Sequence, residues 1–437
     1  EPNNAYKMGF SNSENFKLME SNLEKKIRVL MCPFLAHGHA SVFLELAKRL
    51  VKRNFYVYFC STPAILSSLQ HKIHMDAIEV VELHLPPSPE LPPHYHTLNR
   101  LPPHLLPTLL NTFNHSTSSF HHVLSTICPD FFIHDILPFW AASLANSLGI
   151  LSAAFYIINA SMIAFSLYPE KCVQDYPFPS DILQHLTHLF EHRFALIKTC
   201  RDIEGRYLDM IQGNRKVIPV GCLLEEPDST DDEGSELLQW LDNREPSSSV
   251  FVSFGSQFYL SAEQINEIAM GLEMAEVSFL WVLRFHHANN TRVEDALPNG
   301  FLSRMGEARG KIVEWAPQTK ILRHRSIGGF VSHCGWGSVT ESVMFGVPII
   351  GMPMENDQPI NCKLVENFGV GIEVKRGEDG RITREEVARK IKMAVMEETG
   401  ELMRRNAGEM SLKLKNNEEV EIDSAIKEIR GLLGIMR

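Results

Sequence analysis

The chain has 437 residues, too many for one ordinary hydrophobic core, and this length predicts roughly two to three domains. Its apolar share of 44% and charged share of 22% are those of a soluble globular protein. The net charge is −11 and no long run of Lys or Arg is present, so we expect no nucleic-acid partner.

The eight cysteines form no C-x-x-C pair, which is typical of reduced thiols and predicts a cytoplasmic protein. Residues 1–24 are polar and lack an apolar signal core, so we expect a disordered lead or an extension, with Met19 as a candidate native start. Ile136–Pro169 carries no charge, but Pro138 and Gly149 interrupt it. We therefore predict buried core elements there and no membrane span.

Short apolar runs alternate with helical patterns, such as the one at 40–53, which is typical of parallel α/β units. Two series of runs each suffice for one doubly wound sheet. The predicted strands are 27–32, 55–60, 77–83, 130–135, 152–157 and 194–200 in the first series, and 250–254, 279–285, 311–315, 328–333, 347–353 and 369–374 in the second.

The stretch 220–240 between the two series is acidic and rich in turn residues, which predicts a linker. We therefore expect one domain at 25–225 and a second at 226–415, with a ligand site in a cleft between them. The last residues, 416–437, are predicted to form a helix that packs back toward the first domain.

Trp315–Gln358 contains an apolar strand, a Gly-bearing turn and a helix predicted from about Ser338. A helix that begins after such a turn presents free N–H groups and can bind phosphate. Ser338 and Glu341 would share a face of this helix, and a carboxylate is a natural acceptor for two ribose hydroxyls. The alternative is a capping box, in which Ser338 and Glu341 only start the helix.

A dinucleotide site is a second alternative for this stretch. Gly335, Trp336 and Gly337 follow a strand and open a helix, with Glu355 about 20 residues further on. Thr340 stands where the third glycine of that pattern belongs, so the nicotinamide-dependent oxidoreductase remains a remote alternative. No P-loop and no D-x-D metal motif is present, and no metal is expected.

His39 and Asp135 both follow predicted strands, where ligands of open α/β sheets bind. His39 could act as a general base, and Asp135 could hold its imidazole in one tautomer. An ordinary surface histidine and a turn-capping aspartate are the alternatives. His37 is a neighbour that could be mistaken for the base.

The 44-residue stretch Trp315–Gln358 resembles the donor-binding signature of plant family 1 UDP-glycosyltransferases, and the resemblance extends from about Lys25 to Arg437. Within that family the chain is most similar to the branch that adds a sugar to the sugar of a plant glycoside. This closer likeness is carried by stretches such as 43–50, 81–94, 196–207 and 330–339.

The resemblance implies a GT-B fold, with two facing doubly wound Rossmann-like domains and a cleft between them. The acceptor would bind the N-terminal domain and the UDP-sugar the C-terminal one. We expect an inverting transfer of glucose from UDP-glucose to a sugar hydroxyl of a small-molecule glycoside, in a β linkage. The chain would act as a monomer without cofactor or metal, with His39 as base and Asp135 as its partner. Transfer to an aglycone hydroxyl and a catalytically silent UDP-sugar binder are the alternatives.

The resemblance also implies roles for single residues. The family usually has Asn where this chain has Gly337, so one side-chain contact to phosphate would be missing. The apolar residues of an acceptor wall could equally be core; they are Phe34, Leu35, Phe139, Trp140 and Ile157. The implied donor residues are Trp315 and Ala316 for the uracil, Gln318 and Glu341 for the ribose, His333, Gly337, Ser338, Gly255 and Ser256 for the diphosphate, and Trp336, Asp357 and Gln358 for the sugar hydroxyls, with the closing Gln typical of glucose.

Overall fold

The computed structural model describes residues 26–99, 101–172, 187–190, 192–225, 234–255, 258–285 and 292–435. The chain forms two compact units, residues 1–155 with 426–437 and residues 156–425. The linker predicted at 220–240 includes residues 226–233, which lie outside the described residues.

Seven parallel strands form the first sheet, in the order β3-β2-β1-β4-β5-β6-β7. Six of them match the predicted runs, and β7 was not predicted. The strands are β1 (Ile27–Cys32), β2 (Phe55–Ser61), β3 (Ile78–Glu82), β4 (Phe131–His134), β5 (Leu151–Tyr156), β6 (Phe194–Ile197) and β7 (Lys216–Pro219).

The second sheet has six parallel strands in the order β10-β9-β8-β11-β12-β13. All six match predicted runs. They are β8 (Ser249–Ser253), β9 (Ser278–Val282), β10 (Gly310–Val313), β11 (Ile327–Ser332), β12 (Ile349–Gly351) and β13 (Gly371–Glu373).

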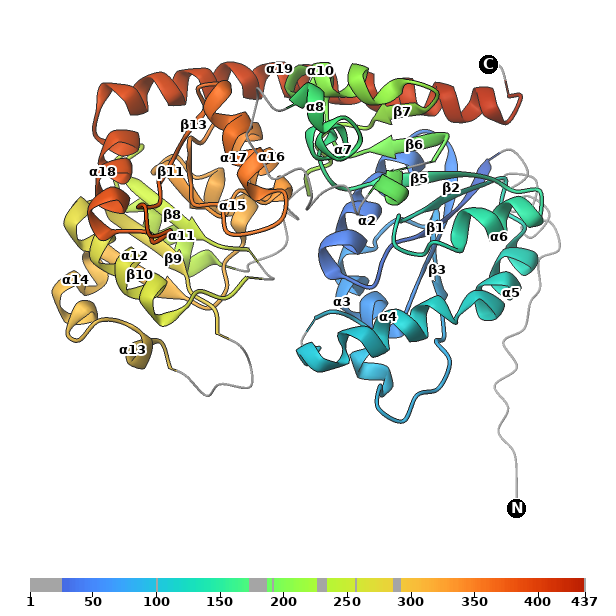
Figure 1. Ribbon diagram of the computed structural model, residues 1–437, viewed down its shortest axis with the longest axis horizontal. Coiled ribbons are helices and arrows are strands. Elements are labelled where there is room, and N and C mark those ends of the chain that lie inside the picture. Colours follow the sequence, from blue (N-terminus) through green and yellow to red (C-terminus); the bar gives the residue numbers. More distant parts are fainter. Residues whose placement is uncertain are drawn as a thin grey trace, which may run out of the picture. The chain divides into compact units, whose positions relative to one another are not determined.

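Helices connect the strands, as parallel pairing requires (Figure 1). Among the described residues, no helix is both long and apolar enough to cross a membrane, and α6, β5 and α7 divide the uncharged stretch after Asp135. The helices are α2 (His37–Val51), α3 (Pro63–Leu69), α4 (Leu106–Asn114), α5 (Thr117–Ile127), α6 (Ala141–Ser147), α7 (Ala160–Leu167), α8 (Pro169–Cys172), α10 (Arg201–Gln212), α11 (Ser235–Asp242), α12 (Ala262–Ala275), α13 (Val293–Ala296), α14 (Phe301–Arg309), α15 (Gln318–Leu322), α16 (Trp336–Met344), α17 (Gln358–Asn367), α18 (Arg384–Val395) and α19 (Glu398–Leu432), with 3-10 turns η1 (Gln70–Lys72), η2 (Pro93–Tyr95), η3 (Pro103–Leu105) and η4 (Thr187–Phe190).

Side chains of β8 alternate between two cores, because successive residues of a strand face opposite sides of the sheet. Val250 and Val252 pack with the apolar residues of α12 and α18, which lie side by side (Figure 1). Phe251 packs on the other face with residues of α11 and α15, and its ring stacks on that of Phe330 with centroids 5.0 Å apart. Both faces of this sheet are therefore covered, as in a doubly wound fold.

Each sheet changes winding direction once, between β1 and β4 in the first and between β8 and β11 in the second. In open α/β sheets, ligands bind beyond the carboxyl ends of the strands at such a point. His39 follows β1 and Asp135 follows β4, while Gly255 follows β8 and His333 follows β11. The topology thus places four of the predicted residues at the two positions where a ligand site is expected.

The last helix differs from its prediction. α19 begins at Glu398, well before residue 416, and continues to Leu432. Near its end, Arg430 donates from Nη2 to the backbone oxygen of Arg53 over 3.1 Å, and its guanidinium lies 5.8 Å from the centroid of the Phe55 ring.

Candidate active site

His39 and Asp135 are in direct contact. His39 lies in the first turn of α2, and its Nδ1 is 2.7 Å from Oδ2 of Asp135. The imidazole is 22% exposed, whereas the carboxylate is 1% exposed. A solvent-accessible ring is thus fixed from one side by a buried acid, which is the arrangement expected of a general base and its partner.

Asp135 is held by backbone groups as well as by His39. Oδ2 accepts from the N–H of Phe34 at 3.1 Å, and Oδ1 accepts from the N–H of Ile136 at 2.8 Å. Burial alone would raise the pKa of Asp135, but the charge and hydrogen bond of His39 and these two N–H donors outweigh it and hold the pKa below its usual value. An ionised carboxylate can only accept, so in the neutral form of the His39 ring the hydrogen is on Nδ1 and Nε2 has a lone pair.

The five residues expected to line an acceptor wall have different surroundings. The rings of Phe34 and His39 meet edge to face with centroids 5.4 Å apart. Leu35 is fully buried in the core formed with α4, α5 and α6, and Trp140 packs against Phe120 and Phe113 of the same core. Phe139 is 56% exposed, and Ile157 is partly buried. Of these residues, Phe34 lies against the His39 ring.

Gln318 is the first residue of α15, and its side chain connects that helix to α16. Its Nε2 donates to Oε2 of Glu341 at 2.7 Å and to Oγ of Ser338 at 3.2 Å. α16 begins at Trp336 with Gly335 as its N-cap, so Ser338 is the third residue of the helix. The helix therefore begins two residues before the start predicted at about Ser338. The capping-box alternative is also wrong, because Gly335 is the N-cap and the Ser338 hydroxyl accepts from Gln318. Burial raises the pKa of Glu341, while the Gln318 hydrogen bond and Lys198 lower it.

The indole of Trp315 is 53% exposed on the loop between β10 and α15, so one of its faces can receive a flat ring. The next residue, Ala316, packs against the core shared by α11 and α15. The exposed Trp315 indole is thus attached to the core through Ala316 and is available to a ligand.

His333 directly follows β11 and lies between two glycines. A Cβ atom added to Gly255 would lie 2.8 Å from the ring, and one added to Gly335 would lie 2.5 Å from Nε2. Gly255 also has φ of +73°, which favours glycine. Burial lowers the pKa of His333 to about 4, so the ring is neutral near pH 7 and could meet a phosphate only as a hydrogen-bond donor. Ser256, predicted beside Gly255, lies outside the described residues.

Trp336 is 4% exposed, and its Nε1 donates to the backbone oxygen of Lys198 at 2.7 Å. The single donor of the indole is therefore occupied, so the expected contact of Trp336 with a sugar hydroxyl stays a prediction that would have to use the backbone. Lys198 itself was not predicted as a site residue. The signal in the sequence is a charged residue inside the apolar run 194–200, which was assigned whole to a strand, whereas β6 ends at Ile197.

Asp357 and Gln358 lie at the start of α17. Oδ2 of Asp357 accepts from Nδ2 of Asn361 at 2.8 Å, and burial raises the pKa of Asp357. Oε1 of Gln358 accepts from the N–H groups of Met354 and Glu355 at 2.9 and 3.0 Å. Because its oxygen is occupied, Gln358 can offer a ligand only the N–H groups of Nε2. Asn361, fully buried, also donates to the backbone oxygen of Cys334 at 2.9 Å and was not predicted as part of the site.

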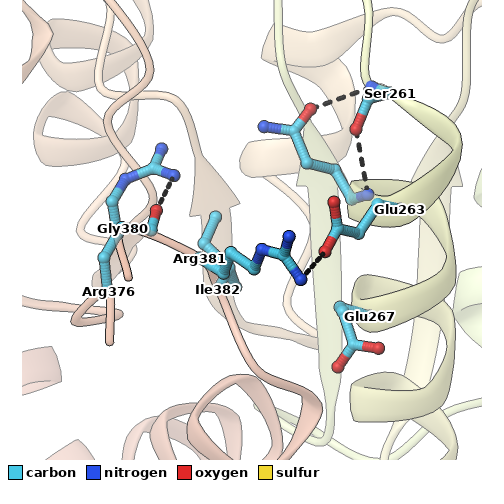
Figure 2. Close-up of a pocket in the computed structure, with 8 residues that line it drawn as sticks. Ser261, Glu263, Glu267, Arg376, Gly380, Arg381 and Ile382 are labelled. Carbon is cyan, nitrogen blue, oxygen red and sulfur yellow. Dashed lines mark hydrogen bonds and ion pairs between the residues drawn. The ribbon is translucent and has the colours of Figure 1, made fainter. Parts of the chain in front are cut away.

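A separate pocket of about 150 Å³ lies between the start of α12 and the loop before α18 (Figure 2). Its charged side chains have partners: Arg381 pairs with Glu263 at 3.2 Å, Glu267 accepts from Arg384, and Arg376 donates to the backbone oxygen of Gly380. Ser261 is occupied as the N-cap of α12. None of the predicted site residues lines this pocket.

Comparison with known proteins agrees with this geometry. A sequence model of the UDP-glucoronosyl and UDP-glucosyl transferase family matches residues 226–420. A mogroside IIIx synthase of Siraitia grosvenorii is 46% identical, with 93% of this chain and 93% of that protein aligned. The beta-D-glucosyl crocetin beta-1,6-glucosyltransferase of Gardenia jasminoides is 42% identical over 92% of this chain and 98% of its own.

The solved structure of apo UGT2 from Phytolacca americana superimposes with a TM-score of 0.77, at 25% identity, over 93% of this chain and all of that one. The two parallel sheets therefore form the GT-B fold of the plant enzymes, as predicted. The oxidoreductase alternative is excluded by the same matches. The chain belongs to the plant family 1 UDP-glycosyltransferases, among relatives that act on glycosides.

Proposed function

We propose that this glycosyltransferase moves glucose from UDP-glucose to a hydroxyl of a sugar already attached to a small plant molecule. The observation that carries the catalytic part is the 2.7 Å contact between Nδ1 of His39 and Oδ2 of Asp135. In the neutral ring this contact puts the hydrogen on Nδ1, so the lone pair of Nε2 is available to an acceptor hydroxyl, as a general base requires.

In the proposed reaction, Nε2 of His39 takes the proton of the acceptor hydroxyl as the hydroxyl oxygen attacks the anomeric carbon of the donor sugar. The bond from that carbon to the β-phosphate oxygen breaks, and its electron pair leaves with UDP. A single displacement inverts the α-linked donor to a β-glycoside. Asp135 stabilises the imidazolium that forms, because it is ionised and lies against Nδ1.

The donor side of the proposal rests on the grouping around α16. Trp315 offers a stacking face. The Gln318 amide nitrogen is occupied by Glu341 and Ser338, so the Gln318 side-chain oxygen and the second carboxylate oxygen of Glu341 would act as acceptors for the ribose hydroxyls. His333, the N-terminal turn of α16 and Ser338 would face the diphosphate. Gln358 and Asp357 would bind the sugar, Gln358 as a donor and Asp357 as an acceptor.

Support for a sugar as the acceptor comes from the relatives. The name of the Gardenia enzyme states that it glucosylates a glucosyl crocetin, and that protein aligns over nearly its whole length. Transfer to an aglycone hydroxyl is the second candidate, since the chemistry at His39 would be identical.

The deciding experiment supplies UDP-glucose with a plant aglycone and, separately, with its monoglucoside, and reads the products by mass. We expect one hexose to be added to the monoglucoside and none to the aglycone. A hexose on the aglycone instead would assign the chain to the other candidate. UDP-xylose and UDP-glucuronic acid, supplied in parallel, test the choice of donor.

A further inference from the structure

Lys198 is anchored at the start of α16 although it belongs to a distant part of the sequence. Its N–H donates to the backbone oxygen of Tyr156 at 2.8 Å, and its own oxygen accepts from Nε1 of Trp336 at 2.7 Å. Both backbone groups are therefore fixed, and the side chain is only 4% exposed. The position of this lysine relative to the first turn of α16 is thus set by two hydrogen bonds.

Among the residues that the structure describes, no carboxylate forms an ion pair with the Lys198 ammonium. Glu341 is the carboxylate that acts on it most strongly, but Oε2 of Glu341 accepts from Gln318 instead. Burial lowers the pKa of Lys198, and Glu341 only partly opposes this. A buried cation without a partner costs folding free energy, so its retention suggests an anion that arrives from outside.

Gly337 has no side chain, so the space next to the Lys198 ammonium at this position is not filled. It is the second residue of α16, and a Cβ atom added to it would lie 3.9 Å from Nζ of Lys198. The N–H groups of this turn have no acceptor within the helix, and they and the helix dipole favour an anion. A lysine nitrogen and a helix N-terminus therefore meet at a position that carries no side chain.

We propose that Lys198 binds the diphosphate of the UDP-sugar in the space beside Gly337, where its positive charge adds to the N–H groups of the first turn of α16. The proposal rests on the proposed donor site at α16 and adds to it a binding residue from outside the donor signature. The diphosphate then serves as the counterion that the described residues do not provide. As UDP leaves in the reaction, the same ammonium stabilises the negative charge that gathers on its β-phosphate.

The test compares the binding of UDP and of uridine to the wild-type protein and to Lys198→Met, by calorimetry. We expect UDP affinity to fall by about 10- to 100-fold, as for loss of one charge-assisted contact, and uridine affinity to stay within about twofold. Lys363→Met is the matched control, because it removes the same charge from a 40% exposed lysine on α17. That variant should bind both ligands as the wild type does.

The ligand-free protein provides a second measurement. Because Met replaces a buried, unpaired cation, we expect the Tm of Lys198→Met without ligand to equal or exceed that of the wild type, while the Tm increase caused by UDP shrinks. In the double variant Lys198→Met with Gly337→Asn, UDP affinity should partly return. Absence of that recovery would overturn the idea that the two positions share one phosphate contact.

Two results would overturn the role of Lys198 itself. Equal losses of UDP and uridine affinity would mean that it acts on the ribose through Glu341 or on the fold. Unchanged UDP affinity would mean that it does not bind the diphosphate. Failure of the donor site as a whole has a different signature, because the wild type would then bind neither ligand and Trp315→Ala would change nothing.

Discussion

Gln318 and Glu341 form one hydrogen-bonded unit across 2.7 Å, although 23 residues separate them in the sequence. The amide nitrogen of Gln318 also reaches the Ser338 hydroxyl at 3.2 Å. One carboxylate oxygen of Glu341 is thus held in place, and the other accepts no hydrogen bond from the residues that the structure describes. Because this carboxylate is already ordered, it can accept from a ribose hydroxyl with little further loss of side-chain entropy.

Glu341→Ala should therefore weaken UDP binding by roughly 10- to 100-fold, the range for loss of hydrogen bonds to a charged group. Calorimetry with UDP and with its 2′,3′-dideoxy analogue separates the ribose contact from other effects. The variant should bind the two ligands equally, whereas the wild type should prefer UDP. A preference for UDP that survives in the variant would refute the ribose assignment.

His39→Ala should reduce glycosyl transfer by about 10²- to 10⁴-fold, the usual range for a positioned general base, and leave UDP affinity nearly unchanged. His37→Ala is the matched control, since this exposed residue lies two positions away on the same helix and contacts Ser68 at 3.2 Å. It should retain wild-type rates. The assignment of the base fails if His37→Ala loses activity and His39→Ala keeps it.

Asp135→Asn tests the tautomer argument. The Asn side-chain oxygen should keep the position of Oδ1 and accept from the N–H of Ile136, so its NH₂ takes the position of Oδ2 and faces Nδ1 of His39, which also removes the acceptor of the Phe34 N–H. Nδ1 would then accept, the proton would move to Nε2, and the base would be blocked. We expect a loss on the order of 10²-fold or more in rate at constant UDP affinity, measured by the same mass assay.

Gln358→Glu changes the donor sugar contact without changing size. One carboxylate oxygen can still accept from Met354 and Glu355, but the N–H donors of Nε2 are lost. Affinity for UDP-glucose should fall by about 10-fold, while affinity for UDP alone should stay the same. Calorimetry with both ligands checks this, and an equal loss for UDP would contradict a role confined to the sugar.

Both sheets could be predicted well from the sequence, because parallel strands that are covered on two faces consist of continuous apolar runs. His39 and Asp135 could be placed at one edge of a sheet because they lie at the carboxyl ends of two such runs, whereas their pairing as base and partner was implied by the family resemblance. β7 was missed because only four residues form it and Pro219 ends it. Proline in a short run argues against a strand unless the strand lies at an edge, as β7 does.

Contacts between distant segments were beyond the sequence patterns. Trp336 and Lys198 are 138 residues apart, and no periodicity relates them. The same holds for Asn159 and Asn361, which form a buried amide contact beside Asp357. The start of α16 was misplaced because Ser338 is a good N-cap by type, whereas the chain uses Gly335 there and gives the serine hydroxyl to Gln318. Local preference was overridden by a tertiary hydrogen bond.

Glu421 on α19 should make stability depend on pH near neutrality. Its Oε1 accepts from the N–H of Arg201 at 2.6 Å, and the side chain is 7% exposed. Burial, with the charges of Asp202 and Glu418, raises its pKa to about 7. The folded state therefore holds a proton more tightly than the unfolded state, so this contribution to stability is complete below about pH 4.5 and is lost as the pH rises to 7.

A shift of this size corresponds to about 3 kcal/mol, at roughly 1.4 kcal/mol for each pH unit between the two pKa values. Glu421→Gln keeps the acceptor for Arg201 but cannot ionise, so its Tm should exceed that of the wild type at pH 8 and match it at pH 5. Glu409→Gln, an exposed position on the same helix, should follow the wild type at both pH values. Thermal unfolding of the three proteins decides the point: if the wild type and Glu421→Gln shift in parallel between pH 5 and pH 8, Glu421 does not titrate in this range.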